Sequence, residues 1–325
     1  MSDFKVLLTR HLPEAVEAAF QAQFDVRLNT SDMPLTQQEL RNALLHYDAI
    51  CPTVNDRIPA KLFNKIESPR TRIIANFGVG FNHIDIAAAN AKGITVTNTP
   101  DVLTDATADL AMTMLLMVAR RTGEGERQLR SRQWTGWFPT HLMGNMVSGK
   151  TLGIIGMGRI GLAMAHRANK GFGMKILYQN RHPLSADKLG DLEAAYFDSL
   201  DAMLAHCDFL SLHCPGGENN RHLLNDRTLA LLPKHAYVIN TARGDVIDEA
   251  ALIQALQSGA IAGAGLDVYE KEPAVAEALI KMENVVLLPH LGSATHETRF
   301  AMGMRVLDNL KAFFEGKNVP DLVSP

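Results

Sequence analysis

The chain has 325 residues, of which 46% are hydrophobic and 21% charged, proportions that are typical of a globular protein and exclude a wholly disordered one. The formal charge of −3 leaves no basic excess for a phosphate backbone, which argues against nucleic acid as the main partner. The three cysteines, Cys51, Cys207 and Cys214, lack the spacing of a metal site, so we expect reduced thiols in a cytoplasmic protein without a bound metal.

The first hundred residues or so predict strands that alternate with helices. Short apolar runs predict strands at 4–8, 49–52, 73–76 and 94–97, and helical spacing follows the first of them at 13–24. Such alternation is typical of parallel βαβ units. The next apolar run, Leu110–Ala119, is about half the length of a membrane span, so we expect a helix buried in a core or an interface. We expect neither a signal peptide nor a membrane anchor.

A second alternating series begins near residue 150 and is long enough for a whole dinucleotide-binding domain. Its apolar runs predict strands at 151–155, 175–178, 209–212, 236–240, 264–267 and 285–288. One amphipathic helix is expected at 296–315, and it must pack back on the N-terminal domain. The fold class is therefore α/β with two doubly wound parallel sheets: a discontinuous lid domain, 1–98 with 294–325, and a dinucleotide-binding domain, 99–293, with a hinge between them.

A glycine-rich loop follows the strand at 151–155 and opens a helical stretch that runs to Gly171. The loop consists of Gly156, Met157, Gly158, Arg159, Ile160 and Gly161. Its first glycine permits a tight turn, its second lets the backbone approach a pyrophosphate, and its third allows close packing of helix and strand. The helix N-terminus adds N–H donors and partial positive charge. Strand, turn and helix in this order predict a dinucleotide site.

The end of the next strand predicts which dinucleotide binds. An NAD site has an acidic residue about 20 positions after the loop, where it binds the ribose hydroxyls. Here the strand 175–178 ends in Gln179, Asn180 and Arg181, without a carboxylate. A neutral amide beside a guanidinium suits a 2′-phosphate, so the sequence favours NADP over NAD, with Asn180 and Arg181 as cofactor-binding residues. The alternative for Arg181 is a solvated loop residue.

Three polar motifs fall at the ends of later strands of the same predicted sheet, at 238–245, 265–273 and 287–295. Ligands of doubly wound folds bind beyond the carboxyl ends of strands, so Arg243, Glu272 and His290 are expected to converge there. A 2-keto acid carries a carboxylate beside a carbonyl, which the planar donors of Arg243 could bridge. His290 could then protonate the developing alkoxide.

Over nearly its whole length the sequence resembles the D-isomer-specific 2-hydroxyacid dehydrogenases, closest to their glyoxylate/hydroxypyruvate reductase branch. The resemblance includes the three motifs above and the segments 76–85, 98–101 and 107–109. It implies that Arg243 binds the substrate carboxylate, that His290 is the acid–base, and that Glu272 keeps the imidazole protonated. Glu270 is the competing acid, and Glu272 is selected because the family's glutamate stands directly before a proline. The resemblance also implies a homodimer.

The resemblance further implies contacts that no motif by itself requires. The backbone amides of Val79 and Gly80 would bind the substrate carboxylate. Cofactor contacts would come from Thr107, Pro215, Thr241, Ala242, Asp267, His290 and Ser293. Residues 134–144, between two helical stretches and before the first strand of the cofactor domain, would lie near an active site, often that of the neighbouring subunit. Trp137 and Met143 would then shape the substrate pocket, and the alternative is that they pack in an interface or a core. His141, His213 and His222 are expected to be structural or exposed to solvent.

Two other functions stay open on the sequence. Corepressors that resemble this fold bind dinucleotides and act as scaffolds, although they leave the full Arg243, Glu272 and His290 set unexplained. A related enzyme could act on another small anion: formate dehydrogenases carry glutamine where Glu272 stands, which argues against formate, whereas phosphite stays possible.

Overall fold

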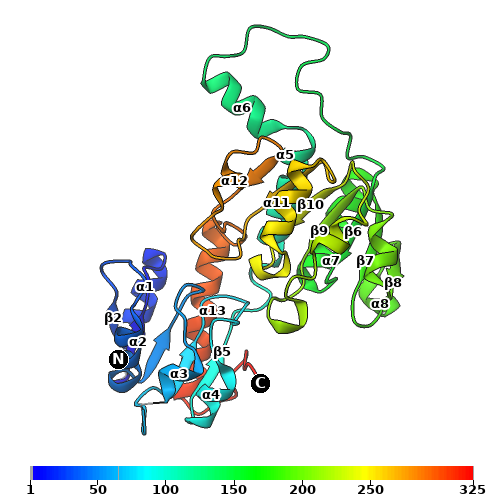
Figure 1. Ribbon diagram of the computed structural model, residues 1–325. Helices are drawn as coiled ribbons and strands as arrows, with labels where there is room; N and C mark the ends of the chain where they lie inside the picture. Colours follow the sequence, from blue (N-terminus) through cyan, green and yellow to red (C-terminus); the bar gives the residue numbers. More distant parts are fainter. Residues whose placement is uncertain (1–2, 65, 325) are drawn as a thin grey trace. The chain divides into compact units, whose positions relative to one another are not determined.

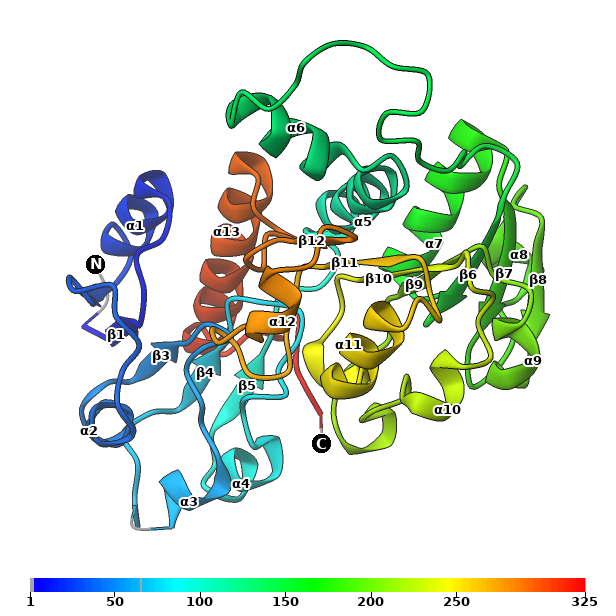
Figure 2. The same cartoon turned by 45° about the horizontal axis from the view of Figure 1, so that its top comes forward.

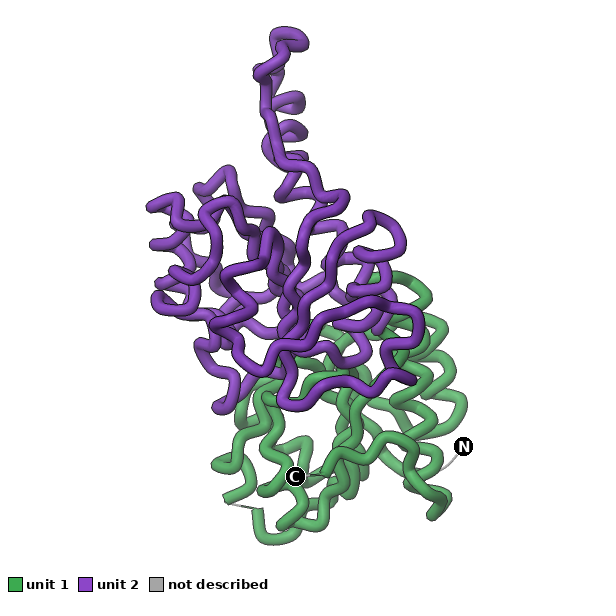
Figure 3. The backbone as a smooth tube through the Cα atoms, turned by 90° about the vertical axis from the view of Figure 1, so that its right-hand side faces the viewer, with its two compact units in different colours: residues 1–103, 293–325 green, residues 104–292 purple. Residues whose placement is uncertain are grey.

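The computed structural model describes residues 3–64 and 66–324, and the chain divides into two compact units (Figure 1, Figure 3). Unit 1 comprises residues 1–103 and 293–325, and unit 2 comprises residues 104–292. The sequence placed the two boundaries after residues 98 and 293, whereas the structure places them after Leu103 and Gly292. The chain therefore leaves unit 1, builds unit 2 without interruption, and returns.

Unit 1 is built on a parallel sheet in the order β2-β1-β3-β4-β5, which is the flavodoxin-like order. Its strands are β1 (Lys5–Leu8), β2 (Asp25–Leu28), β3 (Ala49–Cys51), β4 (Ile73–Ala75) and β5 (Thr95–Thr97). Its helices are α1 (Glu14–Gln21), α2 (Gln37–His46), α3 (Ala60–Phe63), α4 (Ile86–Ala91) and α13 (His296–Phe314). Helix α13 packs against α1 and β4, so the C-terminal helix belongs to the core of unit 1.

Unit 2 is built on a seven-stranded parallel sheet in the order β12-β11-β10-β9-β6-β7-β8. Its strands are β6 (Thr151–Ile155), β7 (Lys175–Gln179), β8 (Ala194–Phe197), β9 (Phe209–Leu212), β10 (Tyr237–Asn240), β11 (Gly263–Leu266) and β12 (Val285–Leu287). The order reverses between β6 and β9, which is the Rossmann arrangement with one further strand. Two doubly wound parallel sheets confirm the predicted fold class.

The helices of unit 2 cover both faces of its sheet (Figure 2). They are α5 (Thr104–Ala119), α6 (Thr122–Arg130), α7 (Arg159–His166), α8 (Ala186–Leu189), α9 (Leu200–Leu204), α10 (Asp226–Leu229), α11 (Glu249–Gln257) and α12 (Glu277–Ile280). Short turns are π-helical at η1 (Arg167–Gly171) and 3₁₀ at η2 (Glu218–Asn220) and η3 (Gly244–Val246). Helix α5 packs against α7, β10 and β11, so it is a helix of the core. Within residues 3–64 and 66–324, no helix is both long and apolar enough to cross a membrane.

A segment that we call the arm, residues 131–149, contains no helix or strand (Figures 1 and 3). The sequence placed residues 134–144 between two helical stretches and before the first strand of the cofactor domain; α6 precedes the arm and β6 follows it, with no second helix between them. With α6, the arm projects from the body of unit 2, and its large apolar side chains are exposed, Trp137 at 79% and Met143 at 66%. The arm therefore carries apolar surface that unit 2 itself does not bury.

Candidate active site

Arg243, Glu272 and His290 follow three neighbouring strands of unit 2. Arg243 follows β10, Glu272 lies in the segment after β11, and His290 follows β12. These strands are parallel and adjacent, so their carboxyl ends lie at one edge of the sheet. The three residues that the sequence singled out are thus presented along that edge.

His290 and Glu272 form a direct pair. The His290 Nδ1 lies 2.8 Å from Glu272 Oε2, and Glu272 Oε1 accepts a 3.1 Å bond from the Tyr269 backbone N–H. Burial raises the pKa of Glu272, but the bonds from His290 and Tyr269 and the charge of Arg243 outweigh it and hold this pKa below its usual value. An ionised Glu272 therefore faces Nδ1 and leaves the Nε2 of His290 for another group.

The neighbouring carboxylate, Glu270, has different partners. Its Oε1 lies 3.0 Å from His222 Nε2 and 3.2 Å from Arg221 Nη2. Of the two acids that the sequence offered, the structure pairs Glu272 with His290 and Glu270 with His222.

A buried aspartate holds the turn that carries His290. His290 has a φ of 57°, which a non-glycine residue rarely adopts, and its N–H donates to the Asp267 carbonyl at 2.9 Å. The Asp267 carboxylate is fully buried and accepts from the N–H groups of Leu291 at 2.6 Å and Gly292 at 2.8 Å. Burial raises the Asp267 pKa, and the two N–H groups oppose that rise. Thr107 Oγ1 donates to the Gly292 carbonyl at 3.0 Å. Asp267 and Thr107, which the resemblance assigned to the cofactor, thus support the His290 turn.

Arg243 is held by its own loop. Its Nη1 donates to the Ala242 carbonyl at 2.6 Å, and Asn240 Nδ2 donates to the Arg243 carbonyl at 2.8 Å. Burial lowers the Arg243 pKa, and the carboxylates of Glu272 and Asp245 oppose that fall. Sequence reasoning did not assign a role to Asn240, although it lies within the motif 238–245 and ends β10.

The glycine loop fits a pyrophosphate. Gly156 has a φ of 88°, and a Cβ there would lie 2.5 Å from the Cys214 backbone nitrogen. A Cβ on Gly161 would lie 2.5 Å from the Gly156 carbonyl oxygen, whereas one on Gly158 would meet nothing within 4 Å. Helix α7 begins after Gly158, and its N-terminus has no side-chain cap. The residues present therefore suit a dinucleotide.

The end of β7 bears no carboxylate. Asn180 Oδ1 accepts from the Met157 N–H at 2.7 Å, and Asn180 Nδ2 lies 3.4 Å from the Met157 carbonyl oxygen. Asn180 is therefore bonded to the glycine loop, while Arg181 is exposed to solvent. The buried Thr241 Oγ1 has no hydrogen-bond partner in the part of the chain that the structure describes.

The remaining predicted residues are divided between the units. Ala242 is buried and Pro215 exposed in unit 2, whereas Ser293 belongs to unit 1 and its carbonyl accepts from Arg299 Nε at 3.2 Å. Val79 and Gly80 lie in unit 1, in the loop after β4.

His141, His213 and His222, which were expected to be structural or exposed, each lie within hydrogen-bond distance of another side chain, His222 of Glu270 as described above. His213 Nε2 lies 2.9 Å from Ser211 Oγ, and burial lowers the pKa of His213 to about 4. His141 Nε2 lies 2.7 Å from Gln128 Oε1. In residues 3–64 and 66–324, no group of three or more His, Cys, Asp or Glu side chains could hold a metal ion.

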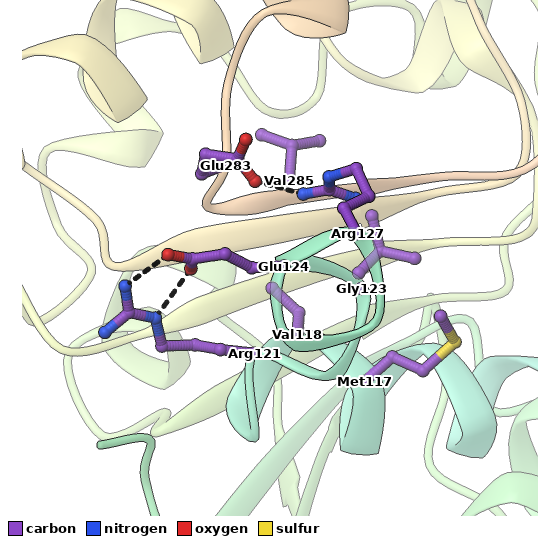
Figure 4. A pocket seen from close by; sticks show the side chains of 9 residues that line it. Met117, Val118, Arg121, Gly123, Glu124, Arg127, Glu283 and Val285 are labelled. Atoms are coloured by element: carbon purple, nitrogen blue, oxygen red, sulfur yellow. Dashed lines mark hydrogen bonds and ion pairs between the residues drawn. The ribbon is translucent and has the colours of Figure 1, made fainter. Parts of the chain in front are cut away.

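A small depression lies at the amino end of β12, opposite to the edge that carries His290 (Figure 4). Ion pairs cross it or border it, Arg127 with Glu283 and Arg121 with Glu124, the second at 2.8 Å. These charges are already paired within the protein, so the depression offers no catalytic group.

Comparisons with known proteins agree with this geometry. The family model of the D-isomer specific 2-hydroxyacid dehydrogenase NAD binding domain matches residues 112–292. A glyoxylate reductase of Thermococcus litoralis is 44% identical over 98% of this chain and 96% of its own. A glycerate dehydrogenase of Hyphomicrobium methylovorum is 39% identical over 98% of both chains. An NADPH-dependent glyoxylate/hydroxypyruvate reductase from Sinorhizobium meliloti, solved with NADP and malonate, superposes with a TM-score of 0.85 at 37% identity, covering 99% of this chain and 97% of that one.

Proposed function

Because the chain belongs to the D-isomer-specific 2-hydroxyacid dehydrogenases, which are NAD(P)-dependent oxidoreductases, we propose that it reduces glyoxylate or hydroxypyruvate and that it prefers NADPH. The observation that carries this proposal is the His290–Glu272 pair on the same sheet edge as Arg243, in the unit that holds the glycine loop. Relatives named for glyoxylate and glycerate support a small 2-keto or 2-hydroxy acid as the substrate.

The catalytic roles follow from the donors that each residue presents. Arg243 binds the substrate carboxylate and polarises the neighbouring carbonyl, since its guanidinium offers two parallel N–H bonds. His290 gives the proton to the carbonyl oxygen from Nε2, because Nδ1 faces Glu272. Glu272 orients the ring and stabilises its protonated form. The N–H groups of Val79 and Gly80 bind the carboxylate as well. The nicotinamide, when bound, supplies the hydride, so these residues manage the charge and the proton.

The preference for NADPH rests on the end of β7. Asn180 Oδ1 accepts from the Met157 N–H, and the amide has neither the second acceptor oxygen nor the negative charge with which an aspartate would bind both ribose hydroxyls. Arg181 is exposed and carries the charge that a 2′-phosphate needs. We expect kcat/KM for NADPH to exceed that for NADH at least about tenfold, which corresponds to about 1.4 kcal/mol.

Saturation curves with NADPH and with NADH test the proposal, with glyoxylate, hydroxypyruvate and bulkier 2-keto acids as substrates. The double variant Asn180→Asp/Arg181→Ala should reverse the cofactor order, since it supplies a carboxylate and removes the phosphate partner. Equal or better use of NADH by the unmodified enzyme would make Arg181 a solvated loop residue. NADP reduction with phosphite alone would identify an enzyme for another anion, and cofactor binding without turnover would identify a scaffold.

A homodimer is the second part of the proposal, and it is supported by the exposed apolar side chains of the arm. Trp134, Trp137 and Met143 are each more than half exposed, which is unusual for large apolar side chains unless another chain covers them. Sedimentation of the wild type against Trp137→Ser/Met143→Ser tests this. A wild-type monomer, or a variant that stays dimeric, would contradict burial of the arm between two copies.

We also propose a cytoplasmic location. Cys51, Cys207 and Cys214 are all free and buried, which suits a compartment where thiols stay reduced. Cell fractionation followed by immunodetection tests this assignment.

A further inference from the structure

The loop that follows β4 in unit 1 has its carbonyl groups held by two asparagine side chains. We call residues 76–80 the amide loop. Asn76 Nδ2 donates to the carbonyl oxygens of Gly78 at 2.9 Å and Gly80 at 3.1 Å. Asn98 Nδ2, just after β5, donates to the carbonyl oxygen of Val79 at 2.8 Å. Three successive carbonyl groups are therefore fixed by side-chain amides.

Fixing these carbonyls also fixes the N–H groups that we assign to the substrate. A peptide unit is planar, and in its trans form the C=O of one residue points opposite to the N–H of the next. The Gly78 carbonyl accepts from Asn76 Nδ2 and also from the Thr99 N–H at 3.1 Å, and these two bonds set the direction of the Val79 N–H. The bond from Asn98 to Val79 sets that of the Gly80 N–H. Neither N–H donates to another residue in the described part of the chain. Both are left for an external acceptor.

We propose that Asn76 and Asn98 are positioning residues that hold the amide loop ready for the substrate carboxylate and so set the affinity for the 2-keto acid. This inference rests on the proposed function, because it takes the carboxylate as the acceptor. Preorganised donors bind an anion without the cost of reorienting peptide units, so loss of either asparagine weakens carboxylate binding.

Asn76 is held through its side chain and Asn98 through its backbone. Asn76 is fully buried, and its Oδ1 lies 3.1 Å from His83 Nε2, which turns Nδ2 toward the loop carbonyls. The N–H of Asn98 donates to the Asp321 carbonyl at 3.3 Å, and Asn309 Nδ2 bonds the Asp321 carboxylate at 2.9 Å. Arg305 makes a two-pronged pair with the same carboxylate, at 2.6 and 2.7 Å.

The experiment compares Asn98→Ala and Asn76→Ala with a matched control, Asn29→Ala. Asn29 also lies in unit 1, and its Nδ2 also donates to two backbone carbonyls, those of Thr9 at 2.9 Å and Met33 at 2.8 Å. None of the three changes alters the charge, so repulsion of the substrate does not enter. We measure KM and kcat for glyoxylate, the Kd of malonate by calorimetry with NADP present, the Kd of NADPH, and Tm.

For Asn98→Ala we expect KM and the malonate Kd to rise together by about tenfold, with kcat within about threefold and the NADPH Kd unchanged. Asn76→Ala should give the same pattern or a larger one, and Asn29→Ala should change neither constant. Asn98 is only partly buried, so this variant tests the proposal even if Asn76→Ala does not fold.

KM and malonate Kd within twofold of wild type in Asn98→Ala would overturn the proposal, as would an equal rise in Asn29→Ala. A wild-type enzyme that reduces no 2-keto acid would instead overturn the proposed function. Malonate binding needs no turnover, so it tests the amide loop in that case too.

Discussion

The glycine loop of unit 2 and the amide loop of unit 1 both follow a parallel strand, and both are proposed to present backbone N–H groups to an anion. They reach that state differently. In the glycine loop, a Cβ at Gly156 or Gly161 would lie 2.5 Å from backbone atoms, so the chain itself excludes any other residue. In the amide loop, asparagine side chains hold the carbonyl groups. Backbone crowding requires glycine at two positions of the glycine loop, whereas the amide loop depends on two asparagines, Asn76 at its start and Asn98 after the next strand.

The largest effect is expected from a change at Arg243 in unit 2. We propose that its guanidinium and the uncharged N–H groups of Val79 and Gly80 in unit 1 bind the same substrate carboxylate. Arg243→Lys keeps the charge but loses the planar pair of donors. We expect kcat/KM for glyoxylate to fall by at least about 10²-fold, because carboxylate binding and carbonyl polarisation are both impaired. Steady-state kinetics with NADPH provide the measurement. Near-normal turnover would remove Arg243 from the mechanism and leave carboxylate binding to the amide loop.

The backbone crowding in the glycine loop is tested by Gly156→Ala. Its Cβ would collide with the Cys214 backbone at a positive φ, so the loop must shift. We expect NADPH binding to weaken by about thirtyfold, which is about 2 kcal/mol. Gly173→Ala is the control, since Gly173 also has a positive φ, 60°, but open space around its Cβ position. If Gly173→Ala weakened NADPH binding as much as Gly156→Ala, the positive φ would be responsible, and not the collision of the Cβ with the Cys214 backbone.

The His290–Glu272 pair gives a pH-dependent prediction. In Glu272→Gln the imidazole loses its ionised partner, so kcat/KM for reduction should fall about tenfold at neutral pH and its decline at alkaline pH should begin earlier. Glu270→Gln is the matched control, because Glu270 pairs with His222. An unchanged pH profile in Glu272→Gln would mean that another group supports the proton donor.

The same pair contributes stability with a defined sign. The pKa of Glu272 is lowered in the folded protein, so the unfolded chain binds its proton first as the pH falls. The stabilisation is therefore fully present above about pH 4.5 and is lost as the pH falls through the lowered pKa. The Tm difference between the wild type and Glu272→Gln should shrink as the pH falls below about 4.5. A difference that grew in acid would contradict the ionised pair.

The smallest effect is expected from Gly78→Ala, the counterpart of Gly156→Ala. A Cβ on Gly78 would lie 3.5 Å from Asn76 Nδ2 and 3.8 Å from its next neighbours, which is ordinary contact. KM for glyoxylate should stay within about twofold of wild type, since the asparagine bonds can persist. A rise as large as that in Asn98→Ala would show that the amide loop, like the glycine loop, depends on its glycine.

These differences explain how much the sequence could predict. The two sheets were predictable because their buried strands are continuous apolar runs, but β2 and β8 were missed. Both are edge strands: β2 carries Asp25 and Arg27, and β8 is a run of four residues that begins with two alanines, which have a low propensity for strands. The glycine loop was predictable from its spacing and its place after a strand, since only glycine fits at two of its positions.

The candidate site was predictable to a lesser degree. Arg243, Glu272 and His290 stand out because motifs at strand ends share an edge. The bonds of Asn180 to Met157 and of Asp267 to the His290 turn were not predictable, because a polar side chain at a strand end can face a ligand or its own backbone with the same sequence. Asn98 and the amide loop lie apart in the chain, so their pairing appears only once β4 and β5 are neighbours.

The contact between Asn98 and Asp321 also has a consequence for biosynthesis. A translating ribosome finishes all of residues 104–292 before Asp321 is made, so the nascent chain can complete the Rossmann unit while residues 3–103 still await α13 and the segment after it. The contact that supports Asn98 is thus among the last to form. The N–H groups that we propose for carboxylate binding depend on Asn98, so they are fixed equally late. A chain whose synthesis stops near residue 300 would carry the whole glycine loop, Arg243 and the His290–Glu272 pair, yet it would lack the contact between Asn98 and Asp321.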